Sequence, residues 1–379
     1  MKKGWKVERL GDVCEVLDSK RKPITKRDRT AGEYPYYGAT GILDYVHEFI
    51  FDEKLVLIGE DGAKWESGEY TAFTAEGKYW VNNHAHVIRP NRSVVLDEWI
   101  VYFLYVSDLH KYVTGLTVPK LNQEKMRSIE IPLPPLPEQK RIVSLLDECF
   151  AALAQVGANA ARNLVNAREV FEGELYEAFE NKNWDEKKFG EVCGFVRGPF
   201  GGSLKKEIFV KDGYAVYEQQ HAIYNQFEDI RYFVKESKFK EMQRFEIHPG
   251  NLIMSCSGTM GKVAIVPKGV KQGIINQALL LLKPSKHLLN TFIKYWMESR
   301  NFQESLRAFS QGAAIQNVAS VKILKEISVP FPPLGEQRRI VQRLDELSKE
   351  TRRLEAAYRQ KMEDVEELRK SVLKEAFQT

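Results

Sequence analysis

Two long stretches of the chain place apolar residues alternately four and three positions apart. The first series is Ile142, Leu146, Cys149, Leu153, Val156, Ala160, Asn163, Ala167 and Val170; the second is Ile340, Leu344, Leu347, Thr351, Leu354, Tyr358, Lys361, Val365, Leu368 and Val372. This spacing predicts two long α-helices with a heptad seam, with few exceptions in each copy. Proline clusters at 132–137 and 330–333 precede them, and Glu138 and Glu336 fall where carboxylates favour a helix N-terminus.

The two predicted helices are equal in length, and neither should be stable alone in water, so we expect them to pair. About 35–40 residues at 1.5 Å per residue would make a pair roughly 55 Å long. A globular segment lies between them in the sequence. An antiparallel pair would put one globular domain at each end, whereas a parallel pair would crowd both domains at one end. We therefore favour the antiparallel arrangement.

The segments before each helix have the pattern of mixed α/β domains. Short apolar runs at 55–58, 86–88, 252–254, 263–266 and 279–282 are separated by turns such as GEDGAK and SCSGTMGK, which is typical of strands. Helical spacing follows near 97–109 and 289–309. The predicted fold class is α+β. Two mixed α/β domains, residues 1–134 and 181–332, alternate with long helices at 135–180 and 333–379.

The chain also repeats itself. IPLPPLPEQKRIV at 131–143 returns as VPFPPLGEQRRIV at 329–341, an offset of 198 residues, and LYEAF at 175–179 returns as LKEAF at 373–377. WKVERLGDVCEV at 5–16 returns as WDEKKFGEVCGF at 184–195, an offset of 179 residues. So long a period indicates a duplicated domain-plus-helix module with an internal pseudo-twofold repeat. One molecule would then carry two similar binding faces.

Composition says more about where the protein works in the cell than about what it does. A net charge of +4 and a pI of 8.6 permit nucleic-acid binding without requiring it. No apolar run approaches the roughly 18–20 residues that span a bilayer, and the start MKKGWKVERLGD lacks the apolar stretch of a secretory signal. We expect a cytoplasmic protein with no membrane partner. Cys14 and Cys193 occupy equivalent repeat positions, which favours buried structural thiols over a disulfide or metal site.

These blocks resemble the specificity subunit of type I restriction–modification enzymes. The doubled proline-EQ-[KR]-RIV openings and the LYEAF and LKEAF helix ends carry the resemblance, which spans essentially the whole chain. Shorter signatures agree: YPYYGATG at 34–41, IGEDGA at 58–63, NNHAHVIRP at 82–90 and SGTMGKVAIV at 257–266.

The resemblance implies that each globular domain is a target-recognition domain for one half of a split double-stranded DNA site. The antiparallel helices would set the gap between the halves and dock two modification subunits, which methylate adenine at N6. A restriction subunit with translocase and ATP-dependent endonuclease activity is an optional further partner. The chain itself would be non-catalytic and hold no cofactor.

The residues show no catalytic constellation. The Pro-Pro pairs lack the Asn or Asp before them and the aromatic residue after them that an N6-adenine methyltransferase needs, and Cys256 stands where a Walker A motif requires glycine. His84 and His86 have no acidic or cysteine partner nearby in sequence, which favours structural or DNA-facing histidines over a metal site. Two alternatives stay open: the recognition region of a free-standing DNA methyltransferase or nuclease, and a coiled-coil scaffold that binds only protein.

Candidate DNA contacts follow from side-chain chemistry. Lysine and arginine neutralise phosphates or pair with guanine, asparagine and glutamine pair with adenine, and planar groups meet base edges or backbone. The alternative for the basic run at 19–29 is a solvated charged loop. The candidates are Lys20, Arg21, Lys22, Tyr36, Tyr37, Lys64, Trp65, Asn82, Asn83 and His84 in the first module, and Arg197, Ser203, Lys205, Lys206, Gln219, Gln220, Ser257, Thr259 and Lys262 in the second.

Overall fold

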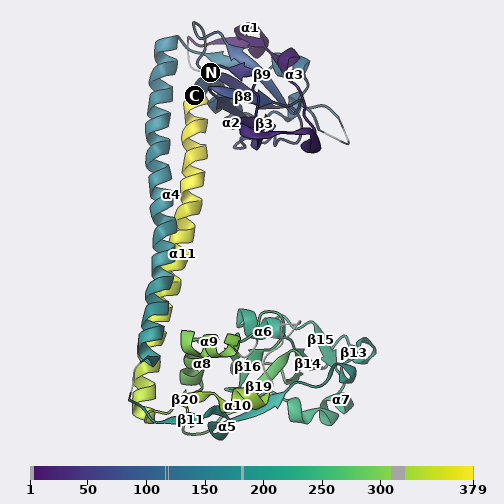
Figure 1. Cartoon of the computed structure of the whole chain (residues 1–379), viewed down its shortest axis with the longest axis vertical. Coiled ribbons are helices and arrows are strands. Elements are labelled where there is room, and N and C mark those ends of the chain that lie inside the picture. Colours follow the sequence, from purple (N-terminus) through teal and green to yellow (C-terminus); the bar gives the residue numbers. More distant parts are fainter. Residues whose placement is uncertain (1–3, 116, 118, 181–182, 309–320, 379) are drawn as a thin grey trace. The chain divides into compact units, whose positions relative to one another are not determined.

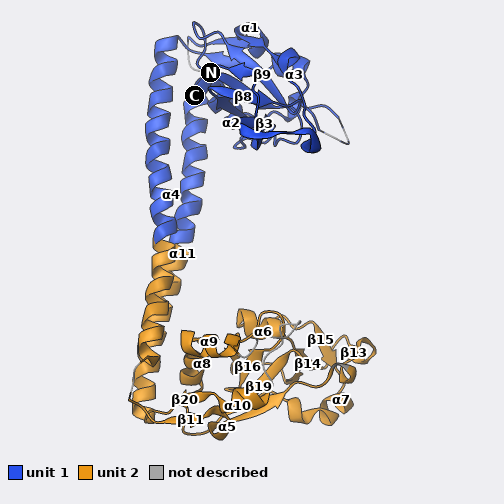
Figure 2. Cartoon of the chain, in the orientation of Figure 1, with its two compact units in different colours: residues 1–162, 358–379 blue, residues 163–357 orange. Residues whose placement is uncertain are grey.

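The computed structural model describes residues 4–115, 117, 119–180, 183–308 and 321–378 (Figure 1). Four boundaries of predicted elements lie outside these ranges. They are residues 1, 181 and 379, which bound three of the predicted domains, and residue 309, where the second predicted short helix ends. The chain forms two compact units (Figure 2). Unit 1 comprises Met1–Arg162 and Tyr358–Thr379, and unit 2 comprises Asn163–Ala357. Each unit therefore combines one α/β domain with parts of both long helices.

Unit 1 contains two four-stranded sheets and a short two-stranded ribbon. The first sheet is antiparallel, in the order β2 (Cys14–Val16), β9 (Ala85–Pro90), β6 (Leu55–Gly59), β7 (Ala72–Ala75). The second has the order β4 (Gly41–Val46), β3 (Ala31–Gly38), β8 (Lys78–Val81), β5 (Phe51–Asp52), and β3 runs parallel to β8. The ribbon is β1 (Lys6–Arg9) with β10 (Glu130–Leu133). The helices are α1 (Leu10–Val13), α2 (Asp97–Val106) and α3 (Gln123–Arg127), with 3₁₀ turns η1 (Asp18–Lys20), η2 (Lys26–Asp28) and η3 (His110–Tyr112).

Unit 2 repeats this plan. Its antiparallel sheet has the order β12 (Cys193–Arg197), β19 (Leu279–Pro284), β16 (Leu252–Ser255), β17 (Val263–Ile265). Its second sheet has the order β13 (Phe209–Val210), β15 (Tyr232–Val234), β14 (Tyr214–Tyr217), β18 (Gly273–Ile275), with β14 parallel to β18. The ribbon is β11 (Glu186–Lys188) with β20 (Ser328–Pro330). The helices are α5 (Phe189–Val192), α6 (Gln219–Tyr224), α7 (Glu236–Glu241), α8 (Asn290–Glu298), α9 (Arg300–Ala308) and α10 (Val321–Glu326), with 3₁₀ turns η4 (Gly201–Ser203), η5 (Lys206–Ile208) and η6 (Gln243–Phe245).

The short-helix predictions need one correction. The helical spacing near 289–309 belongs to two helices, α8 and α9, rather than one. Ser299 separates them with an extended backbone, and its hydroxyl donates to the carbonyl of Trp296 at 2.6 Å. Apolar spacing continues across this break because both helices face the same core, so the periodicity alone could not reveal it.

The long helices are α4 (Leu136–Phe179) and α11 (Leu334–Gln378), and each unit shows separately that they run antiparallel. In unit 1, Ile142 and Leu146 from the start of α4 share a core with Leu373 and Phe377 from the end of α11. In unit 2, the end of α4 meets the start of α11 through Leu175, Phe179, Ile340 and Leu344. The predicted antiparallel pair is confirmed.

Both helices lie within the segments predicted for them, 135–180 and 333–379. Their 44 and 45 residues exceed the 35–40 used to estimate the length of the pair, because the last turns of each helix enter the core of an α/β domain. The predicted seam was only partly right. Six residues of the predicted seam are exposed: Asn163, Lys361 and four apolar residues, Val156 at 36%, Val170 at 57%, Leu354 at 37% and Leu368 at 50%. Two packed helices cover only one narrow stripe of each other. Along the middle of α4, the seam residues buried in this stripe are the small Ala160 and Ala167.

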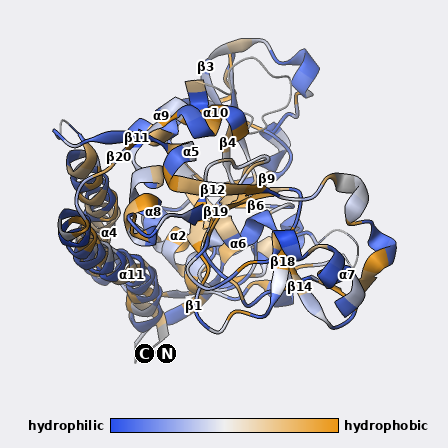
Figure 3. Cartoon of the chain, turned by 90° about the horizontal axis from the view of Figure 1, so that it is seen from below, coloured by the Kyte–Doolittle hydropathy of each residue, from blue (hydrophilic) through white to orange (hydrophobic). Residues whose placement is uncertain are grey.

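α4 is also apolar enough to cross a membrane by length and composition alone, the one such helix in the part of the chain that the structure describes. Over an 18-residue window its mean hydropathy is 1.2. This corrects the expectation that no segment approaches that length. It is weak evidence for a membrane span, because the core helix of a soluble protein passes the same test of length and composition. The visible face of α11 is mainly hydrophilic, whereas the edge strand β12 of unit 2 is largely hydrophobic (Figure 3).

Candidate nucleic-acid interface

Three loops of unit 1 meet at one edge of its first sheet. β2 and β6 both run antiparallel to the central strand β9, and Val16 and Gly59, their last residues, pair with Ile88 and Ala85 near its start. The segments that follow β2 and β6 and precede β9 therefore emerge side by side. We call residues 17–22, 60–71 and 82–84 the loop edge of unit 1. It gathers most of the polar residues that the sequence singled out in this module.

A buried ionic network holds these loops together. Arg21 contacts the carboxylate of Glu60 at 2.5 Å and that of Asp18 at 3.2 Å, and it donates to the carbonyl of Ala85 at 2.8 Å. Lys120 contacts the other oxygen of Glu60 at 2.8 Å. His86 is fully buried, with Nδ1 2.6 Å from Asp18 Oδ2 and Nε2 2.7 Å from the carbonyl oxygen of Leu121. The ring therefore joins Asp18 to the segment that carries Leu121.

The network lowers the pKa of both of its carboxyl groups. Burial by itself would raise the pKa of Asp18, but hydrogen bonds from His86, the backbone N–H of Val87 and Gln123 hold it below the ordinary value. Burial is likewise outweighed at Glu60, where Lys120 and Arg21 lower the carboxyl pKa. Both groups are therefore held in the charged form inside the domain.

The same cluster contains a possible metal-ligand set. One ligand atom each of Asp18, Glu60 and His86 lies within 4.8 Å of the others. The carboxylates, however, already pair with Arg21 and Lys120, and a divalent cation would stand beside these two positive charges. The cluster is better explained as an ion-pair network that fixes the loops.

The structure divides the candidates of unit 1 into supporting and exposed side chains. Arg21 belongs to the network, Tyr36 and Trp65 are buried in hydrophobic clusters, and buried Asn82 accepts a hydrogen bond from the backbone N–H of His84. Half-buried Tyr37 packs on Phe73 and Tyr79. Lys20, Lys22, Lys64, Asn83 and His84 are exposed; Lys64 contacts Glu69 at 3.1 Å and His84 contacts Asp61 at 2.5 Å.

Unit 2 has a loop edge with the same construction. β12 and β16 run antiparallel to β19 and end at Arg197 and Ser255, which pair with Leu280 and Leu279 near its start. We call residues 198–208, 256–262 and 276–278 the loop edge of unit 2. Helix α6 adjoins it, since the backbone N–H of Asn276 donates to the carbonyl of Tyr217 at the end of β14.

The candidates of unit 2 are mostly accessible. Lys205, Lys206, Thr259 and Lys262 are exposed, and Arg197, Ser203, Gln219, Gln220 and Ser257 are half-buried. Gln220 donates to the carbonyl of Asp229 at 3.4 Å, whereas no described residue hydrogen-bonds the buried Oε1 of Gln219. Arg197 lies beside the thiol of Cys256, where burial raises the thiol pKa to about 11 and the guanidinium partly opposes this rise.

Sequence reasoning missed two features of these edges. Lys120 is far from the other network residues in sequence and matches no motif, so only the fold brings it to Glu60. Phe200 is 91% exposed, with a 3₁₀ turn closed by a hydrogen bond from the Ser203 N–H to its carbonyl at 2.9 Å. The sequence RGPFGGSLKK could have indicated this exposure. Glycines flank Phe200 on both sides, and two lysines follow it, so few apolar neighbours in sequence can cover the ring.

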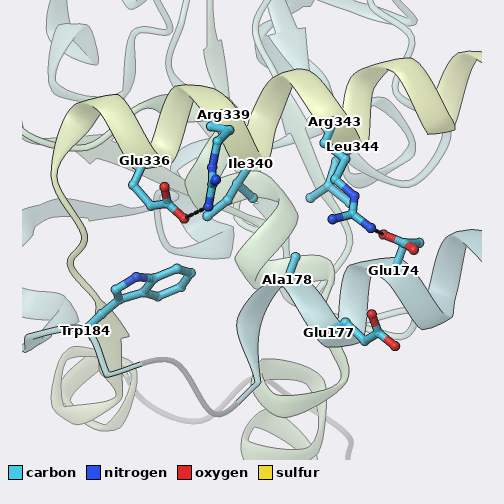
Figure 4. A pocket seen from close by; sticks show the side chains of 9 residues that line it. All are labelled: Glu174, Glu177, Ala178, Trp184, Glu336, Arg339, Ile340, Arg343 and Leu344. Carbon is cyan, nitrogen blue, oxygen red and sulfur yellow. Dashed lines mark hydrogen bonds and ion pairs between the residues drawn. The ribbon is translucent and has the colours of Figure 1, made fainter.

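The cysteines are buried or half-buried, and one cavity of unit 2 has a charged lining. All four cysteines are free thiols, and burial raises the pKa of Cys14 and Cys193 to about 12, which confirms inert structural positions. A cavity of about 240 Å³ in unit 2 lies where α4 ends and α11 begins, with Trp184 at its side (Figure 4). Four of the five charged side chains that line it are paired, Arg343 with Glu174 and Arg339 with Glu336.

Comparisons with known proteins agree with the repeated architecture. The model of the type I restriction modification DNA specificity domain matches the chain twice, over residues 2–160 and 181–364. A Haemophilus influenzae protein named as a type I restriction enzyme specificity subunit is 27% identical over 349 residues, covering 90% of this chain and 86% of that protein. The MjaVIII specificity subunit of Methanocaldococcus jannaschii is 21% identical, covering 97% and 91%.

Solved structures show the same fold. A chain from a type I R-M system has a TM-score of 0.75 at 20% identity, covering 100% of this chain and 98% of that chain. The HsdS subunit of Thermoanaerobacter tengcongensis has a TM-score of 0.60 at 20% identity, covering 100% and 97%. With both of its α/β modules matched, the chain belongs to the family of type I restriction–modification DNA specificity subunits.

Proposed function

We propose that this chain gives a type I complex its DNA sequence specificity, and that each loop edge recognises one half of a bipartite double-stranded site. One observation carries the proposal: two equivalent edges, built on the same strand pairing, carry different side chains. Two asymmetric half-sites require such a pair of differently lined surfaces on a common frame. The chain itself performs no chemistry in this proposal, and two N6-adenine methyltransferase subunits docked on the helices supply it.

Exposed side chains of the loop edges would make the DNA contacts. Lys20 and Lys22 in unit 1 and Lys205 and Lys206 in unit 2 would neutralise phosphates, which positions the domain without reading sequence. Base edges would be read by amide, imidazole, hydroxyl and amine groups. These are Lys64, Asn83 and His84 in unit 1, and Ser203, Gln219, Gln220, Ser257, Thr259 and Lys262 in unit 2.

Phe200 has a separate role in this proposal. An apolar side chain on a basic loop can insert between base steps of the minor groove and kink the duplex. Its exposure and the lysines that follow it support this role. Arg21, Tyr36, Trp65 and Asn82 would then act indirectly, by fixing the loops that carry the contacting residues.

Mapping of methylated adenines tests the function directly. The chain is combined with its modification subunits, the complex methylates unmodified genomic DNA, and modified positions are sequenced. We expect one bipartite motif with a fixed gap. Exchanging residues 1–134 for the corresponding module of another specificity subunit should replace one half-site and leave the other unchanged. Loss of both half-sites, or methylation by the chain alone, would contradict the proposal.

A further inference from the structure

Each long helix is fixed to its α/β domain by a buried glutamine. Gln139, in the first turns of α4, is fully buried. Its Nε2 donates to the carbonyls of Val94 and Pro134, both at 2.9 Å, and its Oε1 accepts from the N–H of Leu96 at 3.1 Å. The side chain thus connects the helix to the segment that leads into α2 and to the proline segment that leads into α4.

Gln337 makes the same three bonds in unit 2. It is fully buried, donates to the carbonyls of His287 and Pro332 at 2.9 Å each, and accepts from the N–H of Leu289 at 2.8 Å. In both units the amide uses both of its N–H donors and its oxygen on the backbone. Replacing it would leave three backbone groups buried without partners.

A second contact fixes each helix further along its axis. The hydroxyl of Tyr102 on α2 donates to Asp147 on α4, and the hydroxyl of Tyr295 on α8 donates to Asp345 on α11 at 2.6 Å. Each aspartate follows its glutamine by eight residues, or about 12 Å along the helix. Two attachment points on one helix fix the angle of the domain as well as its position.

We propose that Gln139 and Gln337, together with Asp147 and Asp345, are positioning residues that hold each recognition domain at one angle on its helix and so restrict the complex to one gap between half-sites. The inference rests on the proposed function. It assigns to the glutamine of the repeated EQ motif a role in spacing and none in the identity of the bases. A glutamine, which bonds only to backbone, suits this role because the recognition surface can then vary freely.

The test replaces each glutamine with leucine in the complex with modification subunits. For Gln139→Leu and Gln337→Leu we expect unchanged half-sites, and methylation of sites whose gap is one base pair shorter or longer. The preference for the normal gap should fall about tenfold, which corresponds to losing the net contribution of about one hydrogen bond. Gln155→Leu is the matched control, because Gln155 lies on α4 but is exposed and bonds only to Asn159.

The possible outcomes distinguish failure of the positioning role from failure of the proposed function. A bipartite motif in the wild type, with both leucine variants less stable but still restricted to one gap, would overturn the positioning role. Absence of any bipartite motif in the wild type would overturn the proposed function and this inference with it. Should the leucine variants fail to fold, Tyr102→Phe and Tyr295→Phe remove the second attachment while keeping both rings. Relaxed spacing in these variants would support the inference, and strict spacing would overturn it.

Discussion

The two loop edges share a frame but differ in what fills it. Strand pairing aligns Cys14 with Cys193 and Ile88 with Leu282, and the turn glycines Gly62 and Gly258 both adopt positive φ, 68° and 61°. Three positions at the edges then correspond pairwise: Asp18 with Arg197, Glu60 with Cys256, and His86 with Leu280. Unit 1 therefore holds its loops with buried charges, whereas unit 2 uses one arginine against a thiol and an apolar residue.

The way each turn is held affects how freely the neighbouring surface can change. In unit 2 the turn after β16 is held locally, by Ser255 Oγ donating to the carbonyl of Thr259 at 2.6 Å. In unit 1 the turn after β6 is held by ions from three separate segments of the sequence. A local hydroxyl bond leaves neighbouring positions free to change, whereas an ionic network constrains all of its members together.

The largest expected effect comes from breaking the network. Glu60→Ala removes the carboxylate that Arg21 and Lys120 share. Arg21 keeps its contact with Asp18, and the side chain of Lys120 is 42% exposed, so the cost should be about 2–3 kcal/mol. Unit 1 should lose this stability, while unit 2 should change little. Hydrogen exchange of each unit across a urea series measures the difference. The control Cys256→Ala, at the equivalent position, should cost about 1 kcal/mol in unit 2. Equal destabilisation of both units would show that the ionic network does not stabilise unit 1 specifically.

Phe200→Ala should weaken recognition through unit 2 only. Loss of an aromatic wedge or stacking group costs about 1–3 kcal/mol, so affinity for duplexes carrying the intact site should fall about tenfold. Phe200→Trp should keep most of the affinity. Fluorescence of a base analogue placed in each half-site would show unstacking by the wild type in one half alone. An unchanged fluorescence signal and affinity in the alanine variant would exclude the wedge.

Acid should destabilise unit 1 more than unit 2 through this network. A carboxyl whose pKa is lowered by folding contributes its stability above its unfolded pKa, about 4, and loses it as pH falls through the lower folded value. Asp18 and Glu60 have such lowered pKa values, whereas the equivalent Arg197 and Cys256 carry no carboxyl. Hydrogen exchange between pH 6 and pH 3 should show earlier opening at the loop edge of unit 1. Earlier opening in unit 2 would contradict this.

The smallest effect is expected from the phosphate contacts. Replacing Lys205 and Lys206 by alanine should weaken binding equally for all sequences and reduce the slope of log affinity against log salt by about 2. The pair Lys20→Ala and Lys22→Ala should do the same in unit 1, because both side chains are exposed and outside the network. A change in the preferred bases would instead show that these lysines read sequence.

The sequence predicted the helices and the repeat well because both are local or periodic. The seam from Ile142 onward and the returning EQ motif required no knowledge of tertiary contacts. The loop edges were harder, since antiparallel pairing with β9 and β19 brings together segments far apart in sequence. Burial of Trp65 and Tyr36 could not be foreseen, because an aromatic residue near a basic run fits a core and a DNA surface equally. Arg21 looked like a phosphate contact until Glu60 was placed beside it.

The composition of unit 1 has a consequence for biosynthesis. Its core includes Phe377, which packs on Trp99 at 4.6 Å between ring centroids, whereas unit 2 consists of one continuous segment, Asn163–Ala357. During synthesis, the residues of unit 2 are all made before the end of α11, on which the core of unit 1 depends. Chains truncated after residue 357 and released from the ribosome should therefore resist protease in unit 2 and remain cleavable near Trp99. Equal resistance of both would show that the N-terminal domain matures without the end of α11.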